Sequence, residues 1–319
     1  MSAITNQSVV SEFVLIGIPG LVEKYHSLVS TSMFIAYIIS LIANSVVILL
    51  IILKRSLHQP MYIIIANLAF SDLLFDTITL PKSIAKYWLG ADTISFYACI
   101  IQIFSVHYLG SLDALFLMLM AIDRYIAICK PLRYHSIITN KLVIWGCSMS
   151  WALDAFYVTV PSVLVSRLTY CGPNKVKNFF CSNQYVTPLS CDEFMSVLRL
   201  CIHFGLVVLL VPLAIIILSY ILIIRVIHLS ANGGNWQKAF YTCTTHLFAI
   251  GLYFVPRAIV YIIIQSSTII NSDLSVIILC FYTYIPHLAS PIIYCLRTAE
   301  IRSHFEKTFK KIFYIGAAV

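Results

Sequence analysis

The sequence predicts an all-α membrane protein: a seven-transmembrane helix bundle followed by a short amphipathic C-terminal helix. Of the 319 residues, 60% are hydrophobic and only 11% are charged. Soluble domains carry about 25% charged residues, so this composition is typical of a chain that lies mostly in lipid. A spanning helix needs about 20 mostly apolar residues. The chain contains seven such segments, at 28–53, 61–84, 97–122, 142–165, 198–224, 239–264 and 273–296.

The distribution of basic residues predicts the orientation, because cytoplasmic loops are enriched in Lys and Arg. Thirteen of the 21 basic residues fall on the side of the C-terminus: Lys54, Arg55, Arg124, Lys130, Arg133, Lys141, Arg225, Lys238, Arg297, Arg302, Lys307, Lys310 and Lys311. Residues 1–27 are therefore expected outside the cell, 28–297 in the bundle, and 298–319 in a cytoplasmic amphipathic helix and tail. The net charge of +8 indicates contact with anionic membrane lipid and no nucleic acid partner.

Two further features fit the predicted outer surface. Asn6 begins an Asn-Gln-Ser triplet, so glycosylation is expected there. Four cysteines lie at outer positions, and an even number in an oxidising compartment favours disulfides. The sequence allows three connectivities. The one adopted as the expectation pairs Cys99 with Cys181, tying the third helix to the loop after the fourth, and Cys171 with Cys191 within that loop.

Arg124 lies at the cytoplasmic end of the third apolar segment, between Asp123 and Tyr125. Arginine does not lose its proton, so at this depth it needs an acceptor. The neighbouring carboxylate can hold it in one state, and a docking protein can release it in another. The pattern is typical of a signalling switch rather than of a catalytic site.

A second arginine, Arg257, follows Pro256 inside an apolar helix. A buried guanidinium favours a bidentate acceptor. One hypothesis is an anionic ligand such as a carboxylate or sulfate, with His107 as a second polar contact. The alternatives are an internal pair with Asp154 or Asp273, or snorkelling to the surface. A lone histidine on a helix face is also more often a packing residue than a ligand contact.

Several motifs together resemble those of rhodopsin-like G-protein-coupled receptors, and more narrowly those of odorant receptors. They are PMY at 60–62, MAIDRYIAIC at 120–129, PLRY at 131–134, KAF at 238–240 with Thr242, Cys243 and His246, and PIIY at 291–294. The segment GIPGL at 17–21 resembles the opening of class I, or fish-like, odorant receptors. The resemblance covers nearly the whole chain.

Three features of the sequence depart from the pattern of that family. Ser290 stands where an asparagine is usual before the last helical proline. Tyr253 and Phe254 invert a Phe-Tyr pair, and Asp113 replaces a glutamate. These departures concern the tuning of activation and leave the class unchanged.

The resemblance implies a small-molecule odorant bound in the outer half of the bundle, where the third, fifth and sixth helices face each other. Residues 182–184, held by the Cys99 link, could cover the cavity. The predicted ligand-binding residues are Val106, His107, Gly110, Ser111, Gln184, His203, Phe204, Phe254, Arg257, Ala258, Tyr261 and Gln265.

The resemblance also implies a cytoplasmic activation switch that couples to the G protein. Tyr220 and Tyr294 would swing inward to meet Arg124 or a helix of the G protein. The alternative is that both tyrosines are interface-belt aromatics. The predicted switch residues are Asp123, Arg124, Tyr125, Tyr220, His246 and Tyr294.

Asp72 and Asp113 are carboxylates near mid-membrane on the second and third helices. An isolated ionised carboxylate is costly there, so each should be neutral, paired or bound to a cation. The resemblance implies a shared pocket with Asn44 and Ser290 that holds an allosteric sodium ion, and no other cofactor. The alternative is a pair of protonated acids in a polar helix interface.

Other classes of protein fit the sequence less well. Motifs for nucleophilic, zinc or phosphate chemistry are lacking, so no enzymatic activity is expected. Residues 274–296 contain no lysine for a retinal Schiff base. The predicted function is an odorant receptor that activates a heterotrimeric stimulatory G protein and raises cyclic AMP. It would lie in the plasma membrane of olfactory cilia. The alternative is a non-olfactory, metabolite-sensing receptor of the same fold.

Overall fold

The computed structural model describes residues 10–18, 20–229, 236–265 and 283–293. Six long helices account for most of the chain: α1 (His26–Leu53), α2 (Pro60–Leu89), α3 (Phe96–Cys129), α5 (Asn140–Ser166), α7 (Met195–Leu229) and α8 (Trp236–Gln265). Residues 283–293 are also helical and belong to the predicted seventh helix. The helices α5, α7 and α8 are therefore the predicted fourth, fifth and sixth, and two short helices, α4 (Tyr134–Ile137) and α6 (Asn183–Val186), lie in the connections.

Most of the long helices extend a few residues beyond the apolar segments that predicted them. Local capping explains where several of them begin and end. Ser95 accepts a hydrogen bond from the backbone N–H of Ala98 at the start of α3, and Thr139 does the same for Leu142 at the start of α5. At the end of α2, Gly90 adopts the left-handed conformation that favours glycine. Hydropathy detects the apolar stretch, whereas capping sets the ends.

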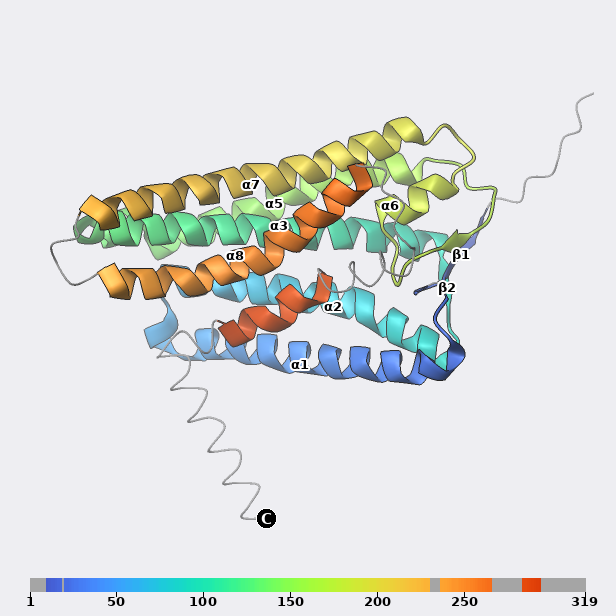
Figure 1. The fold of residues 1–319 in the computed structure, drawn as a ribbon, viewed down its shortest axis with the longest axis horizontal. Helices are drawn as coiled ribbons and strands as arrows, with labels where there is room; N and C mark the ends of the chain where they lie inside the picture. The colour runs from blue at the N-terminus through green and yellow to red at the C-terminus, as the bar shows by residue number, and fades with distance from the viewer. Residues whose placement is uncertain (1–9, 19, 230–235, 266–282, 294–319) are drawn as a thin grey trace, which may run out of the picture.

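Within the described residues, four helices are long and apolar enough to cross a membrane by length and composition. They span Glu23–Leu53, Pro60–Leu89, Asn140–Ser166 and Met195–Leu229. The helix α3 carries Asp113, Asp123 and Arg124 in its second half, which lowers its apolar character. It packs against α2, α5, α7 and α8, and Figure 1 shows it running through the middle of the bundle. The charged positions of α3 thus lie on a helix that is surrounded by its neighbours.

A small sheet that the sequence analysis did not predict covers one end of the bundle (Figure 1). Its strands are β1 (Glu12–Leu15), β2 (Thr93–Ser95) and β3 (Lys175–Val176), in the order β2-β1-β3. The strand β1 is antiparallel to β2 and parallel to β3. Phe13 and Leu15 alternate inward and are fully buried, so this end has its own apolar core. Strands this short leave little trace in a hydropathy scan.

The chain turns sharply after β1 at Gly17, where the positive φ of 70° suits glycine. The next residue, Ile18, donates its backbone N–H to the Tyr87 hydroxyl over 3.0 Å. A Cβ atom at position 17 would overlap that hydroxyl group. The turn therefore needs glycine both for its backbone conformation and for its close approach to α2.

Gly17→Ala is expected to lower the free energy of unfolding by about 1–3 kcal/mol, because strain and overlap add. Thermal unfolding of the purified chain in nanodiscs measures the effect. Gly90→Ala is the matched control: Gly90 also has a positive φ, of 67°, but no atom within 4 Å of an added Cβ. Equal losses of stability in the two variants would show that the contact with Tyr87 contributes nothing.

Candidate functional site

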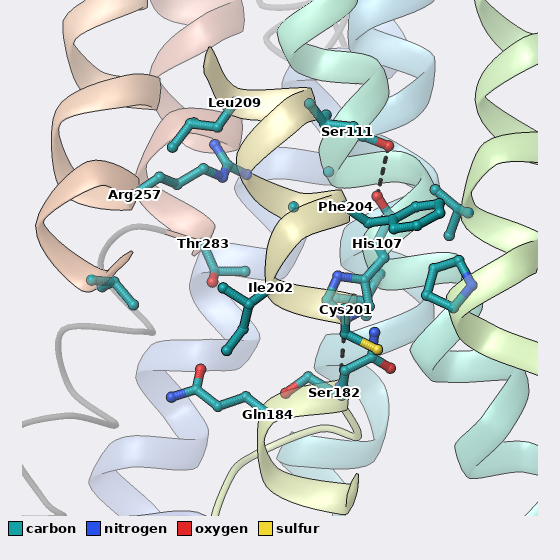
Figure 2. Close-up of a pocket in the computed structure, with 18 of the residues that line it drawn as sticks. His107, Ser111, Ser182, Gln184, Cys201, Ile202, Phe204, Leu209, Arg257 and Thr283 are labelled. Atoms are coloured by element: carbon teal, nitrogen blue, oxygen red, sulfur yellow. Dashed lines mark hydrogen bonds between the residues drawn. The ribbon is translucent and has the colours of Figure 1, made fainter. Parts of the chain in front are cut away.

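A cavity of about 210 Å³ lies between the helices, beneath the loop that follows α5. Its walls are mostly apolar. Figure 2 shows Arg257 extending from α8 into the space, with His107 on the α3 side and Gln184 beyond the other end. The lining residues are Phe75, Val106, His107, Gly110, Ser111, Tyr157, Val158, Pro161, Phe180, Ser182, Asn183, Gln184, Leu198, Cys201, Ile202, Phe204, Gly205, Val208, Leu209, Tyr253, Arg257, Val260 and Thr283.

The structure brings together seven of the twelve predicted ligand-binding residues, namely Val106, His107, Gly110, Ser111, Gln184, Phe204 and Arg257. His203, Phe254 and Ala258 lie outside the cavity lining. His203 is exposed and bonds to the Arg199 carbonyl, and Phe254 packs into the core. The side chains of Tyr261 and Gln265 lie outside the described part of α8. The α3 face was thus predicted more completely than the faces of α7 and α8.

The cavity also contains residues that sequence reasoning missed. On α7, Leu198, Cys201, Ile202 and Gly205 recur at intervals of three and four residues. This spacing marks one helix face and could have identified them. Phe75, Tyr157 and Thr283 come from α2, α5 and residues 283–293. Nothing in their local sequence sets them apart.

Arg257 is held in a defined orientation. Its guanidinium carbon lies 3.6 Å from the centroid of the Tyr253 ring, in a cation–π contact. The Tyr253 hydroxyl donates to the carbonyl of Gly110 and so fixes the ring against α3. A Cβ atom at Gly110 would lie 3.8 Å from an Arg257 nitrogen. The arginine therefore reaches toward α3 with its guanidinium group over an aromatic ring, in the lining of the cavity.

One of the two acids considered as an internal partner for Arg257 has a partner of its own. Ser111 donates its hydroxyl to Asp154 over 2.6 Å, and both residues are buried. Asp273 lies outside the described residues. His107, opposite Arg257, accepts the backbone N–H of Asn183 at its Nε2 atom over 3.4 Å. The proton of a neutral His107 ring therefore lies on Nδ1.

The loop after α5 is fixed to α3 directly above the cavity. The sulfur atoms of Cys99 and Cys181 lie at bonding distance, with their Cα atoms 5.4 Å apart. Gln102, one turn along α3, accepts the backbone N–H of Cys181 over 2.8 Å. The sulfurs of Cys171 and Cys191 also lie at bonding distance. The first pair places the loop residues 182–184 as the cover of the cavity.

At the other end of the bundle, Asp123 holds Arg124 in an ion pair of 2.9 Å. Asp123 also accepts a hydrogen bond of 2.7 Å from the Tyr134 hydroxyl, on the short helix α4. Burial, and then this hydrogen bond, raise the pKa of Tyr134 above its ordinary value, so the phenol remains a donor. Sequence reasoning had Tyr134 only in a motif and did not assign it this contact.

The other predicted switch residues lie in three different settings. Tyr220 of α7 and His246 of α8 share a hydrogen bond of 2.6 Å in a buried position. Tyr125 packs against the main core. Tyr294, like the glycosylation candidate Asn6, lies outside the described residues. The switch roles themselves remain predictions.

Asp72 and Asp113 meet in a buried polar cluster, together with two residues that the sequence analysis did not select, Asp76 and His287. The His287 Nε2 atom lies 3.6 Å from an Asp72 oxygen and 3.5 Å from an Asp113 oxygen. Its Nδ1 atom lies 2.8 Å from Asp76. Asn44 is also buried and donates to the backbone carbonyls of Ser40 and His287. The predicted sodium ion stays a prediction.

Ser290, the fourth predicted member, is partly buried one turn after His287. The helical periodicity of residues 72–76 could have indicated Asp76, because positions i and i+4 share a face. The approach of His287 depends on how the seventh helix is rotated, which its local sequence does not fix.

The comparisons with known proteins agree with this architecture. The family model described as "Olfactory receptor" matches residues 33–312. Olfactory receptor 1 of Rattus norvegicus is 34% identical over 310 residues, with 96% of each chain covered. Olfactory receptor 6B1 of Homo sapiens is 34% identical over 315 residues, with 98% of each covered. The crystal structure of squid rhodopsin matches with a TM-score of 0.73, over 92% of this chain and 87% of that chain, at 18% identity. This last match concerns the fold alone.

The helical bundle with its cavity therefore has the fold of rhodopsin, and the protein is a G-protein-coupled receptor rather than an enzyme. The chain belongs to the olfactory receptor family. The predicted helix-bundle fold and the predicted family are thereby confirmed. The predicted amphipathic helix and tail, 298–319, lie outside the described residues. The placement of the chain among class I-like members stays a prediction.

Proposed function

We propose that this receptor binds a small anionic odorant, a carboxylate or sulfate, in the cavity beneath the loop after α5. The observation that carries the proposal is the placement of Arg257 and His107 in a mostly apolar cavity. Ligand sites typically combine apolar walls with a few polar groups that fix orientation. The cavity volume of about 210 Å³ lies below the range of 300–1,000 Å³ of drug-sized sites. A small ligand is therefore favoured.

The chemistry of the two side chains supports an anion. A guanidinium is always charged and presents N–H donors that match a carboxylate bidentately. Stacking on Tyr253 limits the freedom of Arg257 before any ligand arrives, which reduces the entropy lost on binding. Because Nε2 of His107 already accepts a hydrogen bond, the Nδ1–H of its neutral ring can donate to the second end of a polar ligand.

The signal would be passed to the G protein at the cytoplasmic end of the helix bundle. In the arrangement described, Arg124 is paired with Asp123 and cannot engage another protein at the same atoms. Activation would break this pair, and a stimulatory G protein would then bind and raise cyclic AMP. The receptor would act at the plasma membrane with its N-terminus outside, in the cilia of olfactory neurons.

A ligand screen tests the proposal with matched compounds. Cells expressing the chain, with surface expression verified, would be exposed to short carboxylic acids, their methyl esters and the amines of equal carbon number, and cyclic AMP would be measured. Acids should activate and their esters should not, because only the acid carries a full negative charge for Arg257. Cells without the stimulatory Gα subunit serve as the control and should not respond. Activation by amines or esters alone would contradict the proposed ligand class.

A further inference from the structure

A second cavity, of about 300 Å³, lies at the end of the bundle that carries Asp123 and Arg124. Three parts of the chain form its walls: the connection between α1 and α2, the short helix α4, and the start of α5. In Figure 1 the connection between α1 and α2 lies at the end opposite the small sheet. The cavity shares no lining residue with the odorant cavity. Its own lining residues are His58, Gln59, Pro60, Tyr134, His135, Ile138, Thr139 and Asn140.

The surface around this second cavity is strongly basic. Residues 54–71 and 124–153, which include all of its walls, contain two and four lysine or arginine residues, respectively, and no aspartate or glutamate. Along these two segments no acid offsets the positive charge, so the surface favours an anionic partner. Five of the six basic residues are exposed, namely Lys54, Arg55, Lys130, Arg133 and Lys141.

The two histidines of the lining are held in place by contacts within the protein. The Nε2 atom of His58 lies 3.1 Å from the carbonyl oxygen of Ile52. Because a carbonyl only accepts, Nε2 carries the proton, and Nδ1 becomes a donor when the ring takes up a second proton. The His135 ring packs edge-on against the Tyr134 ring, with 5.1 Å between the centroids. Both imidazoles can therefore gain a positive charge beside an anion.

Two long helices begin at this cavity. The helix α2 begins at Pro60 and α5 begins at Asn140, and the first turn of a helix carries a partial positive charge that stabilises anions. The Asn140 side chain donates to the carbonyl of His58 over 2.8 Å and fixes the start of α5 against the connection after α1. The walls are thus positioned before a ligand arrives, and the helix dipoles add to the charge of the basic side chains.

Exposed apolar residues beside the cavity indicate a lipid rather than a soluble anion. Leu53, the last residue of α1, is 70% exposed. On α5, Leu142 and Trp145 follow Asn140 within two turns and are 46% and 62% exposed. Acyl chains can pack on these side chains while the headgroup enters the cavity. Basic pockets between spanning helices on the cytoplasmic side are suited to phosphorylated lipid headgroups.

We propose that this cavity binds the headgroup of an inner-leaflet lipid that carries several phosphate groups, a phosphoinositide. His58 and His135 would contact phosphates inside the cavity, and the exposed lysine and arginine side chains would balance the remaining charge. Tyr134 lines the cavity and also donates to Asp123, which pairs with Arg124. A receptor state in which α4 moves away would bind the lipid less well, so the lipid would favour the arrangement described here. The inference does not depend on the odorant proposed above.

The test uses the full chain in detergent micelles, to which phosphatidylinositol 4,5-bisphosphate is added. Native mass spectrometry counts the bound lipid and gives its affinity, and the melting temperature is measured in parallel. The wild type should bind one such lipid tightly and melt at a higher temperature. The double variant His58→Gln/His135→Gln should weaken binding by about tenfold or more, because hydrogen bonds to a charged group are lost. Gln59→Glu should weaken it comparably, because it places a negative charge in the lining at almost unchanged side-chain size.

The matched control is His228→Gln, which removes an exposed histidine from the last turn of α7, outside the cavity, and should leave the affinity unchanged. Equal affinity of the wild type and the double histidine variant would overturn the proposal. So would equal stabilisation by phosphatidylserine at the same total charge, since the surface would then attract any anionic lipid. Binding of soluble inositol trisphosphate as tightly as the lipid would overturn it in favour of a free phosphate. Should the double variant fail to fold, Gln59→Glu decides, and wild-type affinity in that variant overturns the proposal.

Discussion

Arg257→Ala is expected to raise the half-maximal concentration of an acidic agonist at least a hundredfold, with little change for any neutral agonist. Truncating one partner of a buried, hydrogen-bonded charge pair costs about 2–5 kcal/mol, and each 1.4 kcal/mol corresponds to a factor of ten. Arg257→Lys should recover only part of the loss, because lysine keeps the charge but lacks the planar, bidentate donors that stack on Tyr253. Concentration–response curves at matched surface expression measure both effects.

The control for this experiment is Arg199→Ala. Arg199 lies near the start of α7 and is exposed, and its side chain donates to the backbone carbonyl of Met195. Its removal tests whether loss of any outer positive charge reduces the attraction of anions to the receptor. An unchanged response of Arg257→Ala to every active acid would show that the guanidinium has a structural role.

Cys99→Ser is expected to abolish most surface expression and to lower the melting temperature of the protein that remains. Removing a native disulfide typically costs about 2–5 kcal/mol. Here the link also places residues 182–184 over the cavity, so agonist responses should fall further than expression alone explains. Surface labelling, thermal unfolding and mass spectrometry of free thiols would measure the three consequences.

The second cysteine pair provides a graded comparison. Cys171 and Cys191 are 20 residues apart, whereas Cys99 and Cys181 are 82 apart. The loop-closure estimate makes the longer link more stabilising by about 1 kcal/mol. Cys147→Ser, at a buried free cysteine, controls for the loss of a thiol alone. Full expression and potency of Cys99→Ser would mean that the bond does not hold the loop.

The sequence predicted the long helices, because each of them is marked by a long apolar run of consecutive residues. Each long helix was found because an apolar run of twenty or more residues has no other stable form in lipid. The sheet was missed because β1 has four residues and gains stability from β3, about 160 positions further along the chain. Its pairing is a tertiary contact without a local signature.

The residues of the candidate site were likewise predicted where a local pattern in the sequence marks them. The face of α3 with His107 and Gly110 follows from helical periodicity, and the structure places it in the cavity wall. His203 was predicted to approach the cavity from α7, but that helix presents Cys201 and Ile202 to the cavity instead. The meeting of His287 with three aspartates depends on the rotation of three helices, so composition and spacing could not predict it.

The parallel pairing of β1 with β3 has a consequence for biosynthesis. β1 ends at Leu15 and β3 begins at Lys175, and ribosomes add about 5–20 residues per second. The first strand must therefore remain unpaired on this side for roughly 8–32 s before its partner is made. During that interval its edge is open to other nascent chains and to chaperones. The end of the receptor that covers the cavity is thus completed only after more than half of the polypeptide has been synthesised, although its first strand is made at the start.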